Sequence, residues 1–165
     1  MIALTEDKRM LGYGVMTPYS NIFCFATTRR GGFSKGDYAS FNCTPYTGDD
    51  AESVRRNQEL LCNSMPQQPK ELVIPFQTHG TKVEVIDEKY LNATSDERTV
   101  MLQGVDALIT KEPGCCICIS TAYCLPILLY DRKTQVVAAA HAGWRGTVNY
   151  VAGHTLDRMR ALYGP

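Results

Sequence analysis

Three side chains in this sequence have the types and surroundings of a reactive or metal-binding centre. They are His79 in Gln-Thr-His-Gly, Cys124 in Cys-Leu-Pro and His141 in Ala-His-Ala-Gly-Trp-Arg-Gly. Imidazole nitrogens and a thiolate are ligands that zinc prefers, and three of them leave a fourth position open, as in catalytic zinc sites. The three residues are far apart in sequence, so only the fold can bring them together.

The residue types alone leave three kinds of site open. A hydrolytic or phosphorolytic zinc site would hold Cys124 as thiolate and lower the pKa of a bound water. A nucleophilic dyad would use Cys124 as nucleophile and His141 as its base. Two histidines with a cysteine are also the ligands of blue copper. A conventional multicopper centre needs many more histidines than the three of this chain.

A predicted β-hairpin brings Cys124 and His141 together. The apolar runs 127–131 and 135–140 are joined by the polar turn 132–134, which is typical of a hairpin. If the turn centres on Lys133, the numbers of paired residues sum to about 266. Cys124 and His141 then face each other at the open end of the hairpin, roughly 5 Å apart.

The other elements follow from apolar patterns and punctuating residues. His79 is expected in a tight turn between strands at 71–76 and 81–87. Further strands are predicted at 1–4, 21–28 and 104–110, and a buried one at 116–120. A helix is predicted over 51–65 after Asp49 and Asp50, and another over 148–164 with Thr147 as its cap.

Length and composition narrow the class of protein. The 165 residues favour a single domain, 1–165. A net charge of zero with no basic patch gives no reason to expect a nucleic-acid partner. No apolar run approaches 18 residues and no signal peptide is evident, so neither a membrane span nor secretion is indicated. Seven cysteines without a secretory signal are expected to be thiols, which favours the cytoplasm.

Most of these cysteines need no special role. Small thiol side chains are often buried and behave as compact apolar groups. This is the expectation for five of them: Cys24, Cys43, Cys62, Cys116 and Cys118.

Five segments together resemble the YfiH/YlmD laccase-domain family. They are TTRRGGFSKGDYASFN, PFQTHG, GVDALIT, STAYCLPILLYD and AAAHAGWRGT, in that order. Members of this family have been called polyphenol oxidases and are similar to zinc-dependent purine nucleoside phosphorylases. The resemblance extends over almost the whole chain.

The resemblance implies a fold, a cofactor and an activity. The fold would be α+β, with mixed β-sheets sandwiched by outer helices. The family's zinc ligands and catalytic centre would fall on His79, Cys124 and His141. The reaction would be phosphorolysis of adenosine, inosine, guanosine and methylthioadenosine, with adenosine deamination as a second activity. The partners would be a purine nucleoside and phosphate. The alternatives are a copper-dependent polyphenol oxidase and an inactive nucleoside-binding fragment.

Three polar residues are candidates for binding the substrate. Arg145 lies in a glycine-flanked loop next to His141 and suits an anion such as phosphate. Arg29 and Asn42 flank the glycine-rich segment and are further pocket candidates. Trp144 suits either stacking on a base or packing.

The chain departs from the family pattern in two respects. The residue before Cys124 is Tyr123, where the family usually has aspartate. If that acid orients a ligand or handles a proton, activity would be severely reduced. Family members are also longer, so we expect the C-terminal part of the family fold to be missing, with a sheet edge or pocket wall left exposed.

Overall fold

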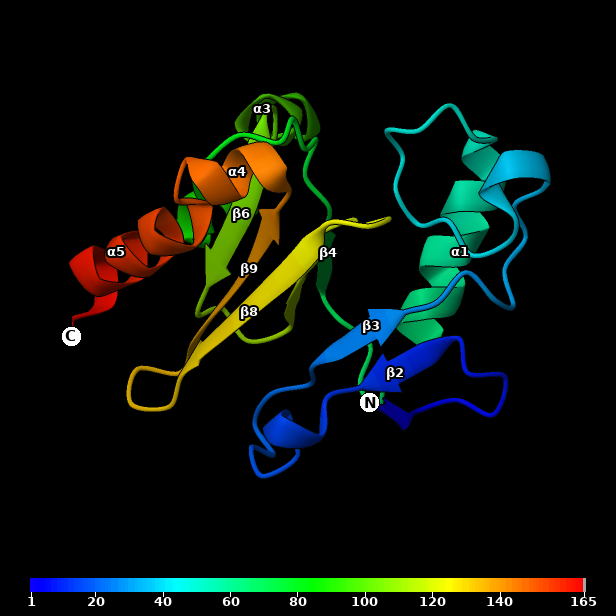
Figure 1. Ribbon diagram of the computed structural model, residues 1–165, viewed down its shortest axis with the longest axis horizontal. Coiled ribbons are helices and arrows are strands. Elements are labelled where there is room, and N and C mark those ends of the chain that lie inside the picture. Colours follow the sequence, from blue (N-terminus) through cyan, green and yellow to red (C-terminus); the bar gives the residue numbers. More distant parts are fainter. Residues whose placement is uncertain (165) are drawn as a thin grey trace. The chain divides into compact units, whose positions relative to one another are not determined.

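The computed structural model describes residues 1–164 and divides into two compact units, Met1–Gln68 and a second that begins at Pro69 (Figure 1). The first unit contains, in order, β1 (Ile2–Ala3), β2 (Met10–Gly12), 3₁₀ helix η1 (Gly14–Met16), β3 (Phe25–Thr27), 3₁₀ helix η2 (Gly36–Tyr38) and α1 (Ala51–Asn63). Its strands form one antiparallel sheet in the order β1-β2-β3.

A buried asparagine on α1 organises the glycine-rich segment of the first unit. The Asn57 amide nitrogen donates to Ser34 Oγ and to the backbone oxygens of Ser40 and Asn42, while its oxygen accepts from the Phe33 N–H. Four partners satisfy every polar atom of this side chain. The segment 33–42 is therefore fixed to α1, although it contains little regular structure.

The second unit contains the three residues singled out above. Its elements are β4 (Glu71–Val73), β5 (Lys82–Ile86), α2 (Glu88–Asn92), α3 (Ser95–Met101), β6 (Val105–Thr110), β7 (Cys115–Ile117), β8 (Leu125–Asp131), β9 (Val136–Ala142), α4 (Trp144–Val148) and α5 (Val151–Tyr163). Four strands form a mixed sheet in the order β5-β6-β9-β8, and β4 pairs with β7 in a separate parallel sheet.

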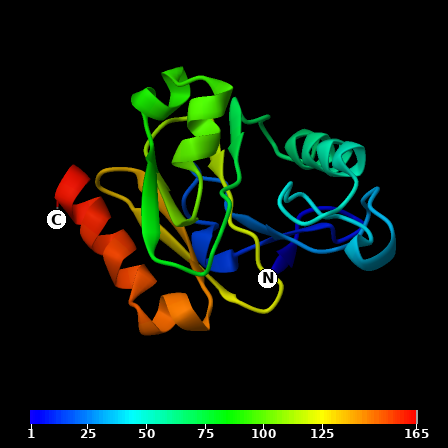
Figure 2. The same cartoon turned by 90° about the horizontal axis from the view of Figure 1, so that it is seen from above.

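Both faces of the four-stranded sheet are covered, which explains why every residue of β6 is buried. Helix α5 covers one face, where Val151 packs on Ala107 and Ala140, and Met159 belongs to a second apolar cluster. The small side chains of β9 let this helix approach closely. The other face packs against β4, α2 and α3, so Figures 1 and 2 show α5 and α2–α3 on opposite sides of the sheet. The expected α+β fold is confirmed.

Two predicted helix starts have different outcomes. Asp50 caps α1 by accepting a hydrogen bond from the Ser53 N–H, as its position before the helix indicated. The expectation that Thr147 caps the last helix is wrong. Thr147 lies within the separate short helix α4, and α5 begins after Tyr150, whose φ of 64° breaks the helical path.

The predicted hairpin is present, and the numbers of its paired residues sum to 267, close to the expected 266. β8 and β9 pair antiparallel, and His141 lies opposite Pro126 rather than opposite Cys124. Cys124 lies just before β8, beyond the last residue pair, Leu125 and Ala142. The predicted buried strand at 116–120 is shorter than expected, since β7 ends at Ile117 and its residues are only half-buried.

Candidate metal centre

His141 is the second-last residue of the buried strand β9. Only 2% of its surface is exposed. Its Nδ1 lies 2.8 Å from Asp106 Oδ1, on the neighbouring strand β6. A carboxylate at Nδ1 holds the proton on that nitrogen and leaves Nε2 as the nitrogen with a lone pair available for a ligand.

Asp106 is the polar anchor of this region. It is fully buried, and besides His141 it accepts hydrogen bonds from the backbone N–H groups of Thr78, His79 and Gly80 at 3.1, 3.0 and 2.7 Å. Burial alone would raise the pKa of Asp106, but the hydrogen bonds from His141, Gly80 and Thr78 outweigh it and hold the pKa below its usual value. Asp106 is therefore a stable buried anion.

His79 is presented by the turn that Asp106 organises. Its φ of 62° is in the left-handed region, which is uncommon for a residue with a side chain. This conformation aims three successive N–H groups at one carboxylate. The His79 ring lies 4.7 Å from the His141 ring, centroid to centroid, with the planes at 74°. One aspartate thus fixes the turn of one histidine and the ring of the other.

Cys124 completes the group. His79, Cys124 and His141 are here called the His–Cys–His cluster, and one nitrogen or sulfur donor atom from each lies within 4.8 Å of the other two. The segment before Cys124 is fastened to the turn of His79 because Gln77 Nε2 donates to the Ser120 oxygen at 2.9 Å, and Gln77 Oε1 accepts from the Ser120 N–H at 2.6 Å. The structure therefore brings together all three residues that the sequence singled out.

Gly143 leaves the space that this cluster needs. A Cβ at this position would lie 2.8 Å from His79 Cδ2, 3.3 Å from Cys124 Sγ and 3.6 Å from His141 Cε1. Its φ of −69° is accessible to any residue, so the requirement for glycine here is steric rather than conformational.

The donor set fits a metal ion. Two imidazoles and one thiol suit zinc or copper, and the Asp106–His141 pair is the carboxylate–histidine arrangement that orients metal ligands in other proteins. A cysteine–histidine dyad would not need the second imidazole. The presence of His79 beside the pair favours metal binding over the dyad.

Arg145 and Trp144 follow directly after Gly143 in α4. Both side chains are exposed, and the guanidinium of Arg145 lies 5.2 Å from the centre of the Trp144 ring. Thr147 Oγ1 donates to the oxygen of Gly143 at 2.9 Å and so holds the start of α4 beside the cluster. A cation and an aromatic ring therefore follow the cluster closely in sequence, and both are exposed.

The other two predicted binding residues lie in the first unit and have local roles there. Arg29 Nε donates to the Ala39 oxygen at 2.7 Å. Asn42 Nδ2 donates to Thr47 Oγ1 and Asp49 Oδ2, and its oxygen accepts from the Thr44 N–H. Both residues hold the glycine-rich segment in shape, and their binding of substrate stays a prediction.

Asp106, Gln77 and Gly143 were not identified from the sequence. Asp106 had a readable signal, because a carboxylate inside the apolar strand Val-Asp-Ala-Leu-Ile must be paired when that strand is buried. Gly143 and Gln77 had none of their own, since their importance depends on which side chains the fold brings beside them.

Comparison with known proteins identifies the family. Residues 23–165 match the model of the family described as multi-copper polyphenol oxidoreductase laccase. The chain belongs to this laccase family. The resemblance drawn from the five sequence segments is confirmed. A protein named purine nucleoside phosphorylase, from Bacteroides thetaiotaomicron, is 61% identical over 99% of this chain.

The chain is also similar to a second named protein and to a solved structure. A protein named adenosine deaminase RL5, from an unknown prokaryotic organism, is 40% identical over 86% of the chain. The crystal structure of YlmD from Geobacillus stearothermophilus superposes on 87% of the chain with a TM-score of 0.77 and 31% identity. The chain spans 61% and 58% of the lengths of the first two relatives and 53% of YlmD.

The helices of residues 1–164 are too short or too polar to cross a membrane.

Proposed function

We propose that this chain carries the metal centre of a purine nucleoside phosphorylase, with zinc held by His79, Cys124 and His141. The proposal rests mainly on one observation, the convergence of three nitrogen and sulfur donors within 4.8 Å. It is supported by 61% identity to a protein named for this activity. The proposed substrates are phosphate and the purine nucleosides adenosine, inosine, guanosine and methylthioadenosine.

Phosphorolysis replaces one bond at the anomeric carbon of ribose by another. A phosphate oxygen forms a bond to the anomeric carbon of ribose while the bond from that carbon to the purine nitrogen breaks, and the purine leaves with a proton. Bound zinc would supply Lewis-acid stabilisation of negative charge. Asp106 keeps His141 oriented and its Nδ1 protonated, so the ring does not have to reorganise during turnover.

The neighbouring residues suit the two substrates. The exposed guanidinium of Arg145 presents a fork of N–H donors, which matches the oxygens of phosphate. The ring of Trp144 is 72% exposed and offers a flat apolar face to a purine. Arg29 and Asn42 are proposed as further binding residues, on the strength of their place beside the glycine-rich segment.

The test combines metal analysis with a product assay on the purified chain. We expect about one zinc per chain and ribose 1-phosphate from inosine and phosphate. The variants Cys124→Ala and His79→Ala should lose both zinc and product, whereas His154→Ala, an exposed histidine on α5, should keep both. Product formation that survives Cys124→Ala would overturn the proposal. Zinc and nucleoside binding without product would favour the inactive nucleoside-binding alternative.

Adenosine deamination is proposed as a second activity of the same centre. It is supported by the 40% identity to a protein named adenosine deaminase. The two reactions are separated by their co-substrates, because deamination consumes water and releases ammonia, while phosphorolysis needs phosphate. Adenosine without phosphate should therefore yield inosine and ammonia. A dependence of ammonia release on phosphate would contradict this second activity.

Copper-dependent oxidation is the remaining alternative, and the description of the family names it. Copper bound by Cys124 would give a visible thiolate-to-copper absorption band. The zinc proposal predicts that copper-loaded protein does not oxidise phenols with oxygen. If the protein oxidises phenols and shows that band, and Cys124→Ala loses both, the site is a copper site rather than a zinc site.

A further inference from the structure

A pair of thiols lies at the end of β7, apart from the His–Cys–His cluster: Cys116 is on the strand and Cys118 follows its last residue. The sulfur atoms of Cys116 and Cys118 are 3.7 Å apart. Alternate residues of a strand share one face, which places these two thiols on the same side of the chain. Two thiols on one face of a strand are not always in contact. The short sulfur–sulfur distance therefore means that the side chains of Cys116 and Cys118 point toward each other.

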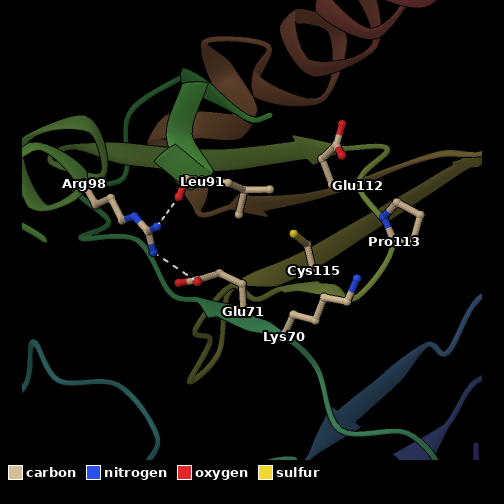
Figure 3. A pocket seen from close by; sticks show the side chains of 7 residues that line it. All are labelled: Lys70, Glu71, Leu91, Arg98, Glu112, Pro113 and Cys115. Atoms are coloured by element: carbon tan, nitrogen blue, oxygen red, sulfur yellow. Dashed lines mark hydrogen bonds and ion pairs between the residues drawn. The ribbon is translucent and has the colours of Figure 1, made fainter. Parts of the chain in front are cut away.

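The neighbouring thiol, Cys115, has a different environment. It points to the opposite face of β7, where it packs on the apolar core and lines a pocket of about 340 Å³ with Glu71 and Glu112 (Figure 3). Burial, followed by the charges of Glu71 and Glu112, raises the pKa of Cys115. This thiol is therefore kept protonated and unreactive.

Cys116 has the opposite tendency. Its hydrogen bond with Cys118 lowers its pKa below the usual value, and this effect outweighs the effect of burial. By contrast, burial and the nearby Cys62 raise the pKa of Cys43 to about 12. The thiolate is the nucleophilic form of cysteine, so Cys116 is better prepared for reaction than Cys115 or Cys43.

Closure to a disulfide needs a modest movement. A disulfide has a sulfur–sulfur distance of about 2.05 Å, so the two sulfurs must approach by roughly 1.6 Å. Cys118 follows the last residue of β7, and its N–H donates to the Val73 oxygen at 2.9 Å. Because β7 ends at Ile117, Cys118 is the partner whose backbone can adjust while the residue pairs between β4 and β7 stay formed.

We propose that Cys116 and Cys118 form a redox-active dithiol that hydroperoxides convert to an intramolecular disulfide. The Cys116 thiolate attacks one peroxide oxygen, which gives a sulfenic acid and releases hydroxide or alcohol. The Cys118 thiol then attacks the sulfenic sulfur, the sulfur–sulfur bond forms and water leaves. In total, two thiols are oxidised, one hydroperoxide is reduced, and the two thiol protons end in the products.

The experiment treats the full chain with stoichiometric hydrogen peroxide, alkylates the remaining thiols and localises them by mass spectrometry. The tryptic peptide 112–132 carries Cys115, Cys116, Cys118 and Cys124, so fragment ions must assign each site. The wild type and the matched control Cys115→Ser should lose two alkylatable thiols, Cys116 and Cys118. A dithiol reductant should restore both.

Two further variants separate the steps. Cys118→Ser should stop at the sulfenic acid, detected as a dimedone adduct on Cys116. Cys116→Ser should slow the oxidation of Cys118 at least ~10-fold, because the thiol proposed to attack the peroxide is gone. Disulfide formation that persists in either variant would overturn the proposal. So would oxidation of Cys115 or Cys124 ahead of the pair in the wild type.

Discussion

The two histidines and the cysteine of the His–Cys–His cluster are held by different kinds of structure. His141 and the turn of His79 share one buried carboxylate, Asp106, the second residue of the fully buried strand β6. Cys124 instead ends the segment 118–124, which contains no helix or strand, and its link to the turn of His79 runs through Gln77 and Ser120. The nitrogen donors are therefore set by the core, whereas the sulfur donor is set by a segment with fewer constraints.

This difference indicates how the site assembles. The imidazoles should be in place before a metal arrives, and the metal should complete the positioning of the sulfur. Changes to Asp106 should then damage the protein itself, and changes near Cys124 should act mainly on metal affinity.

The largest effect is expected for Asp106→Ala. It leaves His141 Nδ1 and three backbone N–H groups without their acceptor, and buried donors left unpaired cost about 1–3 kcal/mol each. We expect the free energy of unfolding of the metal-free protein to fall by at least about 3 kcal/mol, measured by urea denaturation. Asp106→Asn, which keeps one oxygen acceptor, should lose less. Equal stability of Asp106→Ala and the wild type would remove the basis of the comparison.

The next effect is expected for Gly143→Ala. The added Cβ would lie 2.8 Å from His79 and 3.3 Å from Cys124 Sγ, so it separates the donors without disturbing Asp106. Zinc affinity should fall about 10–100-fold, the range seen when groups that orient ligands are changed, with titration against a competing chelator as the measurement. Gly14→Ala, whose Cβ meets only Ile2 at 3.8 Å, is the matched control and should bind zinc normally. Unchanged affinity in Gly143→Ala would mean that zinc binds elsewhere.

A smaller effect is expected for Gln77→Ala. It removes both hydrogen bonds to Ser120 and frees the segment that carries Cys124, while the contacts of Asp106 remain. Zinc affinity should fall about tenfold with a loss of only about 1–2 kcal/mol in stability. Gln68→Ala, an exposed glutamine of the first unit, should change neither. A loss of stability as large as that of Asp106→Ala would show that both parts of the site depend equally on the core.

The smallest structural effect is expected for Tyr123→Asp. The side chain of Tyr123 is 92% exposed, and exposed substitutions usually change stability by less than about 0.5 kcal/mol. Restoring the acid should leave thermal stability and zinc content unchanged and raise the rate of phosphorolysis. Tyr123→Phe should not raise the rate of phosphorolysis. A rate that is the same in both variants would remove Tyr123 from the account of activity.

The sequence predicted the parts of the fold that repeat a local pattern. The hairpin of β8 and β9, the cap of α1 and the turn of His79 all follow from apolar alternation or from a capping residue, and all are present. The partner of His141 is Pro126, two residues from the expected Cys124, because a turn fixes register through backbone geometry that residue types only suggest. The start of α5 was missed because Tyr150 adopts a conformation that few residues other than glycine favour.

The sequence indicated the three candidate ligand residues of the site but not the residues that position them. His79, Cys124 and His141 are candidate metal ligands by residue type alone, whatever their place in the fold. Gln77 and Gly143 act through contacts made across the fold, by hydrogen bonds to distant backbone or by the absence of a side chain. Such roles depend on three-dimensional neighbours, which no local pattern in a single sequence encodes.

The most direct test of the proposed zinc site is X-ray absorption spectroscopy at the zinc edge of the zinc-loaded chain. If His79, Cys124 and His141 form one site, the spectrum will show one sulfur at about 2.3 Å and two imidazole nitrogens at about 2.0–2.1 Å per zinc. The sulfur signal will disappear in Cys124→Ala and persist in Cys116→Ser. A zinc shell without sulfur in the wild type, or a sulfur signal that survives Cys124→Ala, would contradict the account.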